Sequence, residues 1–451
     1  MAGHSTSQNN AAHVDRDAFE EGRVPISLSG WLPLETLPVH AALAGDIETD
    51  TVVIGAGLAG ASTFLHLVEG GANAVLLEAE QPANGASGRN AGHYVPFLDD
   101  VQTFKQWPGD KGARFFDYAV ENRSLVYNIC EKYGLDADCK QLGMVMAAPR
   151  RVKELSKKAR FWRPYGYKVD EVGREELVDM LGTNHFGYGL VWREGGRMNP
   201  YLFTNGMVTS AVELGGRAYG DSPVQACTRE GNLWRVKTPT GSVLTRRVVI
   251  CTAGNKGNAF FPRLGQTSYP LLATALATKP LPPELAAKLM PKGAIVEAHP
   301  GLYHMLLDHR RRLISSTIPA VGKAYDAEHY FKVFTHWVNK AFPVSRDFNI
   351  ELESYWSGMM YNTSHVYKHD YPKVFRVDQG VYALLNLGSW GNFMGPMLGK
   401  SLGHALAEDK PENFIMPIVT PNLVRWPGLF SFTIRRIGVP ALRVVERFGL
   451  V

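Results

Sequence analysis

Three glycines stand at a fixed spacing between an apolar run and a helical pattern. Thr51 to Ile54 is short, apolar and β-branched, which predicts a buried strand. The glycines after it fit G-x-G-x-x-G. In that motif the first glycine permits a tight turn, the second lets the backbone approach a pyrophosphate, and the third lets a helix pack closely on the strand. The N-terminus of that helix offers unpaired N–H groups to phosphates. The loop residues are Gly55, Gly57, Leu58, Ala59 and Gly60.

An acidic residue follows the next predicted strand. Ala74 to Leu77 is apolar and bounded by Gly70-Gly71 and Glu78. Glu78, with Ala79 after it, comes about 20 residues after the glycines, where a carboxylate accepts hydrogen bonds from ribose hydroxyls. An acid at this position disfavours a 2′-phosphate. The order of strand, glycines, helix, strand and acid therefore predicts a dinucleotide fold for FAD or NAD rather than NADP.

A third segment, residues 85–93, reads G-A-S-G-R-N-A-G-H. It resembles a motif of the D-amino-acid-oxidase-like (DAO) flavoproteins, closest to the gamma-glutamylputrescine oxidase branch, in which G-A-S-G-R-N-G-G is usual. In that family the loop wraps the pyrophosphate and isoalloxazine of FAD, so the resemblance implies FAD as the cofactor. Serine and backbone amides can donate to phosphate, and arginine adds positive charge. The residues carried over are Ala86, Ser87, Arg89, Asn90, Ala91, Gly92 and His93.

Two later segments match further signatures of the same family. Residues 247–255 read as a buried strand that ends in small residues where the backbone passes FAD, and Val224 corresponds to a residue on the adenine side. Residues 380–403 read as a strand, a glycine-rich turn and a helix that returns under the flavin. This turn departs from the family's usual Gly-His-Gly. The residues that the resemblance assigns to FAD here are Thr252, Ala253, Gly254, Gly388, Trp390, Gly391, Asn392, Phe393 and Met394.

The resemblance implies oxidation of a C–N bond in a small amine or amino acid, with hydride transfer to flavin and hydrolysis of the imine. The electron acceptor is left open among oxygen, a quinone and a carrier. A flavin monooxygenase and a flavin-bound non-catalytic or accessory subunit are the alternatives. Trp356 is a further pocket candidate, and Arg310, Arg311 and Arg312 are expected to be solvated at a turn. The catalytic candidates are Trp390, His93, Asn392, Tyr303, His304 and Tyr361.

Composition excludes several other classes of protein. The 451 residues carry a formal net charge of +5, which is too mild to indicate nucleic-acid binding. Cys130, Cys139, Cys227 and Cys251 show no C-x-x-C spacing, so reduced thiols are expected. No metal-ligand motif, signal peptide or transmembrane segment is expected, and a cytoplasmic location follows.

The predicted fold class is α/β, with a glutathione-reductase-like Rossmann FAD-binding domain interleaved with an α+β substrate domain built on a large mixed or antiparallel sheet. We expect residues 1–49 to form an N-terminal arm. Residues 50–100, 197–260 and 376–410 are assigned to the FAD-binding domain, and residues 101–196 and 261–375 to the substrate domain. Residues 101–133 are expected to be helical.

The C-terminal tail, residues 411–451, is basic and aromatic. It carries five arginines against two glutamates, with apolar residues interleaved. Pro427, Gly428, Gly438 and Pro440 are expected to break it into short pieces, so that no long amphipathic helix forms. We expect the tail to pack on its own body. An anionic membrane surface and a contact with a partner or a second copy are the alternatives.

Overall fold

Two sheets dominate the computed structural model, which describes residues 29–33, 37–96, 107–253, 260–290, 293–297, 303–362, 373–424, 426–441 and 444. The helices are α2 (Leu58–Glu69), α3 (Lys111–Glu121), α4 (Leu125–Tyr133), α5 (Lys153–Trp162), α6 (Arg174–Leu181), α7 (Pro200–Glu213), α8 (Pro283–Ala286), α9 (Ala327–Ala341), α10 (Gly391–Ala407) and α11 (Pro427–Thr433). Short 3₁₀ turns near the site are η1 (Ala86–Arg89) and η7 (Gly388–Trp390), and a π turn, η9, spans Ile434–Gly438.

The first sheet, called the parallel sheet, has the strand order β19-β17-β18-β11-β1-β2-β8, with β10 and β9 added on β11. Its central pairs β18–β11, β11–β1, β1–β2 and β2–β8 are all parallel, so their carboxyl ends lie at one edge. Its strands are β1 (Gly45–Ile54), β2 (Ala74–Leu77), β8 (Arg217–Tyr219), β9 (Ala226–Glu230), β10 (Leu233–Lys237), β11 (Gly241–Ile250), β17 (Lys373–Asp378), β18 (Val381–Leu385) and β19 (Ile418–Val419).

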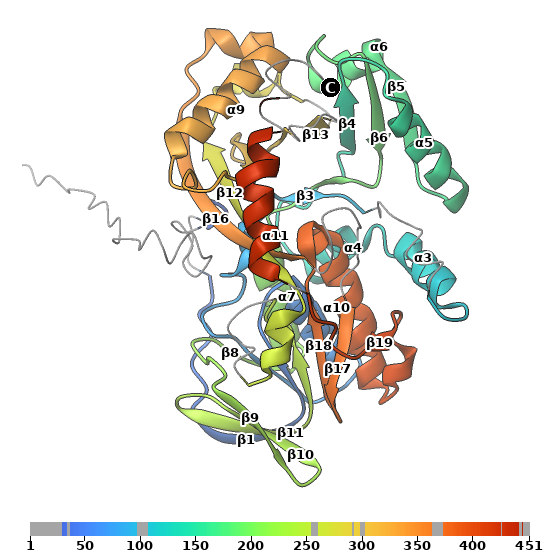
Figure 1. Cartoon of the computed structure of the whole chain (residues 1–451), viewed down its shortest axis with the longest axis vertical. Coiled ribbons are helices and arrows are strands. Elements are labelled where there is room, and N and C mark those ends of the chain that lie inside the picture. Colours follow the sequence, from blue (N-terminus) through green and yellow to red (C-terminus); the bar gives the residue numbers. More distant parts are fainter. Residues whose placement is uncertain are drawn as a thin grey trace, which may run out of the picture.

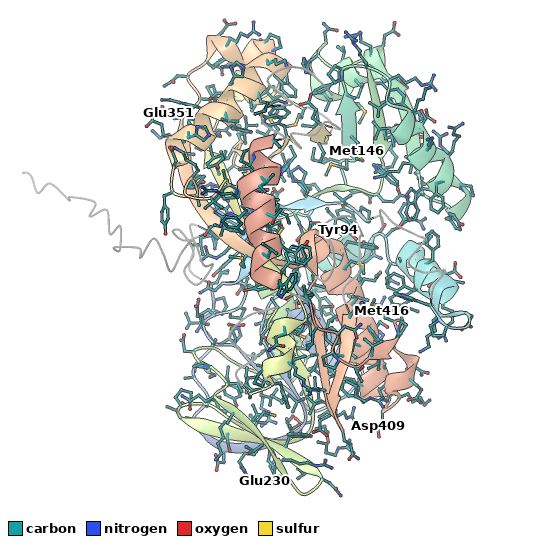
Figure 2. All side chains as sticks on the ribbon, viewed as in Figure 1. Tyr94, Met146, Glu230, Glu351, Asp409 and Met416 are labelled. Atoms are coloured by element: carbon teal, nitrogen blue, oxygen red, sulfur yellow. The ribbon has the colours of Figure 1, made fainter. Side chains whose placement is uncertain are left out.

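The second sheet, called the mixed sheet, has the order β16-β12-β15-β14-β13-β4-β6-β5 and is antiparallel except between β13 and β4. It lies above the parallel sheet in Figure 1, and buried Tyr94 lies midway between them in Figure 2. Its strands are β4 (Met144–Ala148), β5 (Val169–Gly173), β6 (Tyr188–Trp192), β12 (Tyr269–Thr278), β13 (Ala294–Glu297), β14 (His304–Leu307), β15 (Leu313–Thr317) and β16 (Leu352–Asn362). A small pair joins β3 (His93–Tyr94) to β7 (Gly196–Arg197).

This architecture confirms the predicted fold class. The parallel sheet contains strands from residues 45–77, 217–250, 373–385 and 418–419, and the mixed sheet contains strands from residues 144–192 and 269–362. The chain therefore passes back and forth between the two sheets.

Helices α2 and α10 pack unusually closely beside the parallel sheet. A Cβ added at Gly399 would lie 2.6 Å from Ser62 Cβ, and one at Gly403 would lie 2.8 Å from the Thr63 carbonyl oxygen. The Ser62 hydroxyl donates to the Pro396 carbonyl at 2.7 Å. Small residues at every fourth position of α10 thus let the two backbones approach each other. This contact fixes the N-terminal ends of both helices next to the same edge of the sheet.

Several element boundaries differ from the sequence expectation. The predicted helix at 101–133 is two helices in its described part, because residues 122–124 form a turn between α3 and α4. Strand β1 begins at Gly45 rather than near Thr51, and it pairs with β11 along its whole length. Asp46, Glu48 and Asp50 alternate with Ile47, Thr49 and Thr51, which is the pattern of a half-exposed strand that the prediction from the apolar run alone did not include. Residues 101–106 lie outside the described part.

Arg312 is buried, which corrects the expectation that it is solvated. Its guanidinium bonds to Asp308 at 2.9 Å and to Glu353 at 2.6 Å, and it donates to the Gly30 carbonyl at 3.0 Å. Two carboxylates and a carbonyl compensate the cost of removing the cation from water. The sequence showed only a run of three arginines at a turn, and it did not show which of them faces inward.

The tail also differs from expectation, because helical turns run through Pro427 to at least Ala441. Pro427 occupies the first helical position, where a missing N–H costs nothing. The π turn at Ile434–Gly438 widens the helix just before Pro440, which relieves the clash of a proline ring with the preceding turn. Figure 1 shows α11 and its continuation as one rod, and α11 packs on β12.

Candidate cofactor and active site

At its glycine positions, the loop between β1 and α2 has no room for a side chain. Gly55 has φ +100°, a conformation that favours glycine. A Cβ at Gly60 would lie 1.8 Å from the Gly55 carbonyl oxygen, and one at Gly57 would lie 2.7 Å from Ser87 Oγ. The backbone is therefore bare where α2 begins. A phosphate can approach the helix N-terminus there, which is the fit that a dinucleotide requires.

Glu78 braces this loop from the end of β2. Its Oε2 accepts the Ala56 N–H at 2.6 Å, and its Oε1 accepts the Glu80 N–H at 3.1 Å. Burial raises the pKa of the Glu78 carboxyl, while hydrogen bonds from these backbone N–H groups oppose the rise. The carboxylate thus has a structural role that the sequence did not reveal. Its bond to ribose hydroxyls stays a prediction.

The loop of residues 85–93 folds against both α2 and the mixed sheet. Ser87 Oγ accepts the Leu58 N–H at 2.9 Å, so the serine hydroxyl lies at the N-terminus of α2. Arg89 donates to the carbonyls of Asn84 at 2.8 Å and Ser357 at 3.3 Å, and burial lowers the pKa of its guanidinium. The arginine therefore joins the loop to β16. Its contact with a phosphate stays a prediction.

Asn90 and Asn392 form a reciprocal amide pair, called here the amide pair. Each Nδ2 donates to the other residue's Oδ1 at 2.9 Å. Asn392 Nδ2 also donates to the His93 carbonyl at 2.9 Å. Asn90 further binds the Ser87 carbonyl at 2.7 Å and the Gly92 N–H at 2.9 Å. Both amide protons of Asn392 are used, so its side chain positions the loop against α10.

Residues of the N-terminal arm hold the outer side of the same loop. Ser29 Oγ donates to the Gly88 carbonyl at 2.6 Å, and Trp31 Nε1 donates to the Asn90 carbonyl at 2.6 Å. Trp31 is 1% exposed, and its ring occupies the space that a side chain at Gly92 would need. The sequence showed only a tryptophan among prolines, which carries no signal for this role.

The turns after β11 and β18 lie at the same edge of the parallel sheet. Together with the glycine loop and the loop of residues 85–93 they form what we call the cradle. Ala253, Asn386 and Gly388 have φ of +57°, +64° and +58°, so the chain turns sharply just past both strands. Thr252 Oγ1 is buried without a hydrogen-bond partner among the described residues. Ligands of parallel sheets bind at this edge. Gly254 lies outside the described residues.

A cavity of about 430 Å³ opens between the cradle and the mixed sheet, which is a usual size for a ligand pocket. One wall consists of Gly57–Ala59, the loop at Ala86–Ala91 and the turn at Gly388–Asn392. The opposite wall comes from β12, β13, β14, β15 and β16. The predicted residues that line the cavity are Gly57, Leu58, Ala59, Ala86, Ser87, Arg89, Asn90, Ala91, His93, Ala253, His304, Tyr361, Gly388, Gly391 and Asn392.

Two imidazoles meet in this cavity. The rings of His93 and His304 lie edge to face with centroids 4.7 Å apart. His93 Nε2 and His304 Nδ1 are buried and have no partner in the described part of the structure, whereas His304 Nε2 lies 3.0 Å from Ser316 Oγ. Burial lowers the pKa of His93 to about 4 and that of His304 to about 3. Both rings are therefore neutral near pH 7.

Other predicted site residues lie elsewhere. Tyr303 stacks on Trp337 at 5.3 Å in the core under α9 and does not line the cavity. Trp356 is fully buried and donates to the Arg89 carbonyl at 2.8 Å. The backbone of Trp390 belongs to η7, and its side chain lies outside the described part. Residues in the fold around the cradle but outside the cavity lining are Gly55, Gly60, Glu78, Ala79, Gly92, Val224, Thr252, Phe393 and Met394.

The wall opposite the cradle was largely missed. Strand β12 presents Ala273, Thr274 and Ala275, and burial raises the pKa of Tyr361 on β16 to about 12. Small and apolar residues carry no chemical signature, so only the alternation of the strands could have indicated which of them face the cavity. On the opposite wall the missed lining residues are Ala273, Thr274, Ala275, Val296, Ser316, Gly358, Met359 and Met360, and on the cradle side they are Cys251, Leu384, Leu385, Asn386, Leu387 and Ser389.

A separate group of possible metal ligands lies between α2 and α10. Ligand atoms of His66, Glu69 and His404 lie within 4.8 Å of one another. Lys132 pairs with Glu69. The pKa of His404 is lowered mainly by burial and also by the charge of Lys400. Two ammonium groups at this position disfavour a further cation. The group is better described as an ion-pair cluster than as a metal site.

The state of the cysteines and the character of the helices bear on two earlier expectations. All four cysteines lie in the described part of the chain, and none of them forms a disulfide there. None of the described helices has the length and apolar character that a bilayer crossing requires.

Comparisons with known proteins identify relatives over most of the chain. Gamma-glutamylputrescine oxidoreductase of Escherichia coli K12 is 25% identical over 390 residues, which is 85% of this chain and 88% of the relative. Probable oxidoreductase OrdL of Haemophilus influenzae is 23% identical over 416 residues, covering 89% and 93%. The solved L-amino acid deaminase from Proteus myxofaciens has a TM-score of 0.68 at 17% identity, covering 85% and 94%, which shows the shared fold.

The family comparison covers all three motifs of the cradle. Residues 50–405 match the DAO family, described as FAD dependent oxidoreductase. This range runs from β1 and the glycine loop through the amide pair to Ala405 in the last turn of α10. The chain therefore belongs to the DAO family of FAD-dependent oxidoreductases.

Proposed function

We propose that the protein oxidises a C–N bond of a small amine or amino acid, with the parallel sheet holding the cofactor and the mixed sheet holding the substrate. The observation that carries the proposal is the cavity between the two sheets. One of its walls is the dinucleotide cradle, and two neutral imidazoles meet in it, His93 at the end of the loop of residues 85–93 and His304 on the opposite wall. FAD would supply the two-electron acceptor for the hydride on the carbon next to nitrogen.

The cradle residues would hold and orient the cofactor. The bare backbone at Gly57 and the N-terminus of α2 suit a pyrophosphate. The N-terminus of α10, fixed by the amide pair, places backbone N–H groups beside the turn at Gly388–Trp390. Such a helix end stabilises negative charge.

The histidine pair suits a neutral amine. An amine must lose its extra proton before it can release hydride, and a buried pocket disfavours the ammonium form. Each neutral ring has a nitrogen that can accept or donate one hydrogen bond, according to its tautomer. His93 and His304 would therefore bind the substrate nitrogen without adding a charge. Loss of hydride and a proton leaves an imine, and water converts the imine to a carbonyl compound and a free amine.

The test is anaerobic mixing of the FAD-loaded protein with primary amines, N-methyl amines and amino acids. At least one substrate should bleach the flavin band near ~450 nm and yield a carbonyl product. If none does while dithionite still bleaches the band, the proposal fails and a non-catalytic flavin subunit becomes the better description.

A matched pair of variants tests the role of the imidazoles. His304→Ala should lower turnover by about 10-fold or more while FAD stays bound, because loss of a positioned proton partner typically costs this much. His309→Ala is the control, since His309 is half exposed on the turn after β14. Equal turnover in the two variants would exclude His304 from the reaction.

A further inference from the structure

The helix at the C-terminal end of the described chain carries apolar side chains on its outer face. Trp426 is 74% exposed, Leu429 55%, Phe432 51%, Ile437 61% and Val444 54%. Exposed positions within the helix recur every three to four residues, at 429, 432, 433, 436, 437, 440 and 441, so the apolar side chains among them lie on one side of the helix. We call these five residues the outer stripe. Large side chains this exposed, gathered on one element, mark an interaction surface.

The opposite face of the same helix is firmly attached to the body. The rings of Phe430 and Tyr269 lie 5.7 Å apart, and Arg435 is buried with its Nε donating to the Pro319 carbonyl at 3.1 Å. Just before the helix, the Val424 N–H donates to the Gln266 carbonyl at 2.8 Å. The inner face therefore packs as the sequence predicts for the tail. The outer stripe is an additional surface, presented in a fixed orientation.

Charge indicates what this surface contacts. Between Glu412 and Glu446 the sequence holds four arginines and no acidic residue, and of these Arg435 is buried and does not add to the charge of the outer face. Exposed Arg436 lies over the Phe432 ring at 5.9 Å, so a cation stands within the outer stripe itself. A second copy docked symmetrically would bring equivalent arginines together, with no carboxylate on the stripe to compensate them.

A lipid surface with anionic headgroups satisfies both features at once. Apolar side chains enter the acyl boundary, tryptophan prefers the interface, and arginine pairs with the headgroups. From the outer stripe and its arginine, we propose that this helix binds an anionic membrane surface. The helix lies in the plane of the membrane interface and holds the protein there. The helix covers β12, which forms one wall of the cavity, so the active site is held at a fixed distance from the lipid.

The experiment uses the full-length FAD-loaded protein and vesicle flotation. Vesicles are either phosphatidylcholine alone or an equal mixture with phosphatidylglycerol. The test variant combines Trp426→Ser, Leu429→Gln and Phe432→Gln. The matched control combines Leu142→Gln, Val212→Gln and Leu214→Gln, which are also exposed apolar side chains but lie outside the tail. FAD content and melting temperature should match the parent in both, because all six residues face solvent.

The parent should bind the mixed vesicles, and binding should weaken as salt rises. The stripe variant should lose about 100-fold in affinity, because three half-exposed large side chains no longer enter the lipid. The control should bind like the parent, and Arg436→Gln should lose about 5-fold and show a weaker salt dependence.

Three outcomes would overturn the proposal. The first is a parent protein that does not float with mixed vesicles. The second is a stripe variant that floats as well as the parent. The third is a parent that sediments as a dimer and becomes a monomer when the stripe is changed, because a second copy would then cover this face.

Discussion

The amide pair should contribute measurably to the stability of the cofactor cradle, and a double-mutant cycle isolates its contribution. The changes are Asn90→Ala, Asn392→Ala and both together. A net hydrogen bond contributes about 1 kcal/mol to stability. Asn392 makes three such bonds and Asn90 makes four, two of which are the mutual ones. The free energy of unfolding should therefore fall by about 3 kcal/mol in Asn392→Ala and by about 4 kcal/mol in Asn90→Ala.

The double variant should lose only about 5 kcal/mol, because the two mutual bonds are counted once. The coupling energy is then about 2 kcal/mol, or about 30-fold in an equilibrium constant. Urea unfolding of the FAD-loaded and cofactor-free protein measures the fall in the free energy of unfolding. Titration with FAD shows how much of this fall appears as weaker cofactor binding.

A control cycle pairs Asn90→Ala with Asn339→Ala, whose partner Ser345 lies in the core under α9. That pair should be additive within about 0.5 kcal/mol. If the Asn90–Asn392 cycle is equally additive, the two amides do not act as a unit, and the reasoning about how the loop is joined to α10 is wrong.

Three further predictions concern the cradle, the pocket and pH. Gly60→Ala should lower the free energy of unfolding by about 3 kcal/mol or more, because its Cβ would lie 1.8 Å from a carbonyl oxygen. Gly85→Ala is the control, since a Cβ there meets open space and should change this free energy by less than about 0.5 kcal/mol. Thermal unfolding of the two variants compares them. Trp390→Ala should alter amine preference or turnover while FAD stays bound, and unchanged kinetics across the amine panel would contradict this. Because the pKa of His93 is lowered to about 4 and that of His304 to about 3, the unfolded chain takes up protons near pH 6.5 that the folded chain does not. The free energy of unfolding should therefore fall from about pH 6.5 toward pH 4, by up to about 1.4 kcal/mol per pH unit for each histidine, and His304→Asn should make the fall shallower.

Motifs with a strict backbone requirement were predictable from the sequence. Gly55 and Gly60 are needed because the chain turns and packs where no side chain fits, and that need is visible as spacing alone. The fold class followed from the same motifs, since three segments far apart in the sequence all belong to one cofactor cradle.

Side-chain roles were less predictable, because they depend on partners distant in the sequence. Asn392 lines the cavity, but the sequence did not show that its amide bonds to Asn90, 302 residues away. Tyr303 and Trp356 are aromatic residues next to the site that serve as core instead. Arg312 illustrates the same limit, since only the positions of Asp308 and Glu353 show that it is buried.

The close packing of α2 against α10 has a consequence for how the protein is made. Ser62 and Pro396, which form a buried hydrogen bond across this contact, are 334 residues apart. At a synthesis rate of about 5–20 residues per second, α2 waits about 15–70 s on the ribosome before its partner exists. Until then its apolar face and the glycine loop have no helix to close them, and contacts of such long range also form slowly. The apolar face of α2 therefore stays open to aggregation until α10 has been made, and the cradle, to which both helices contribute, is complete only late in synthesis.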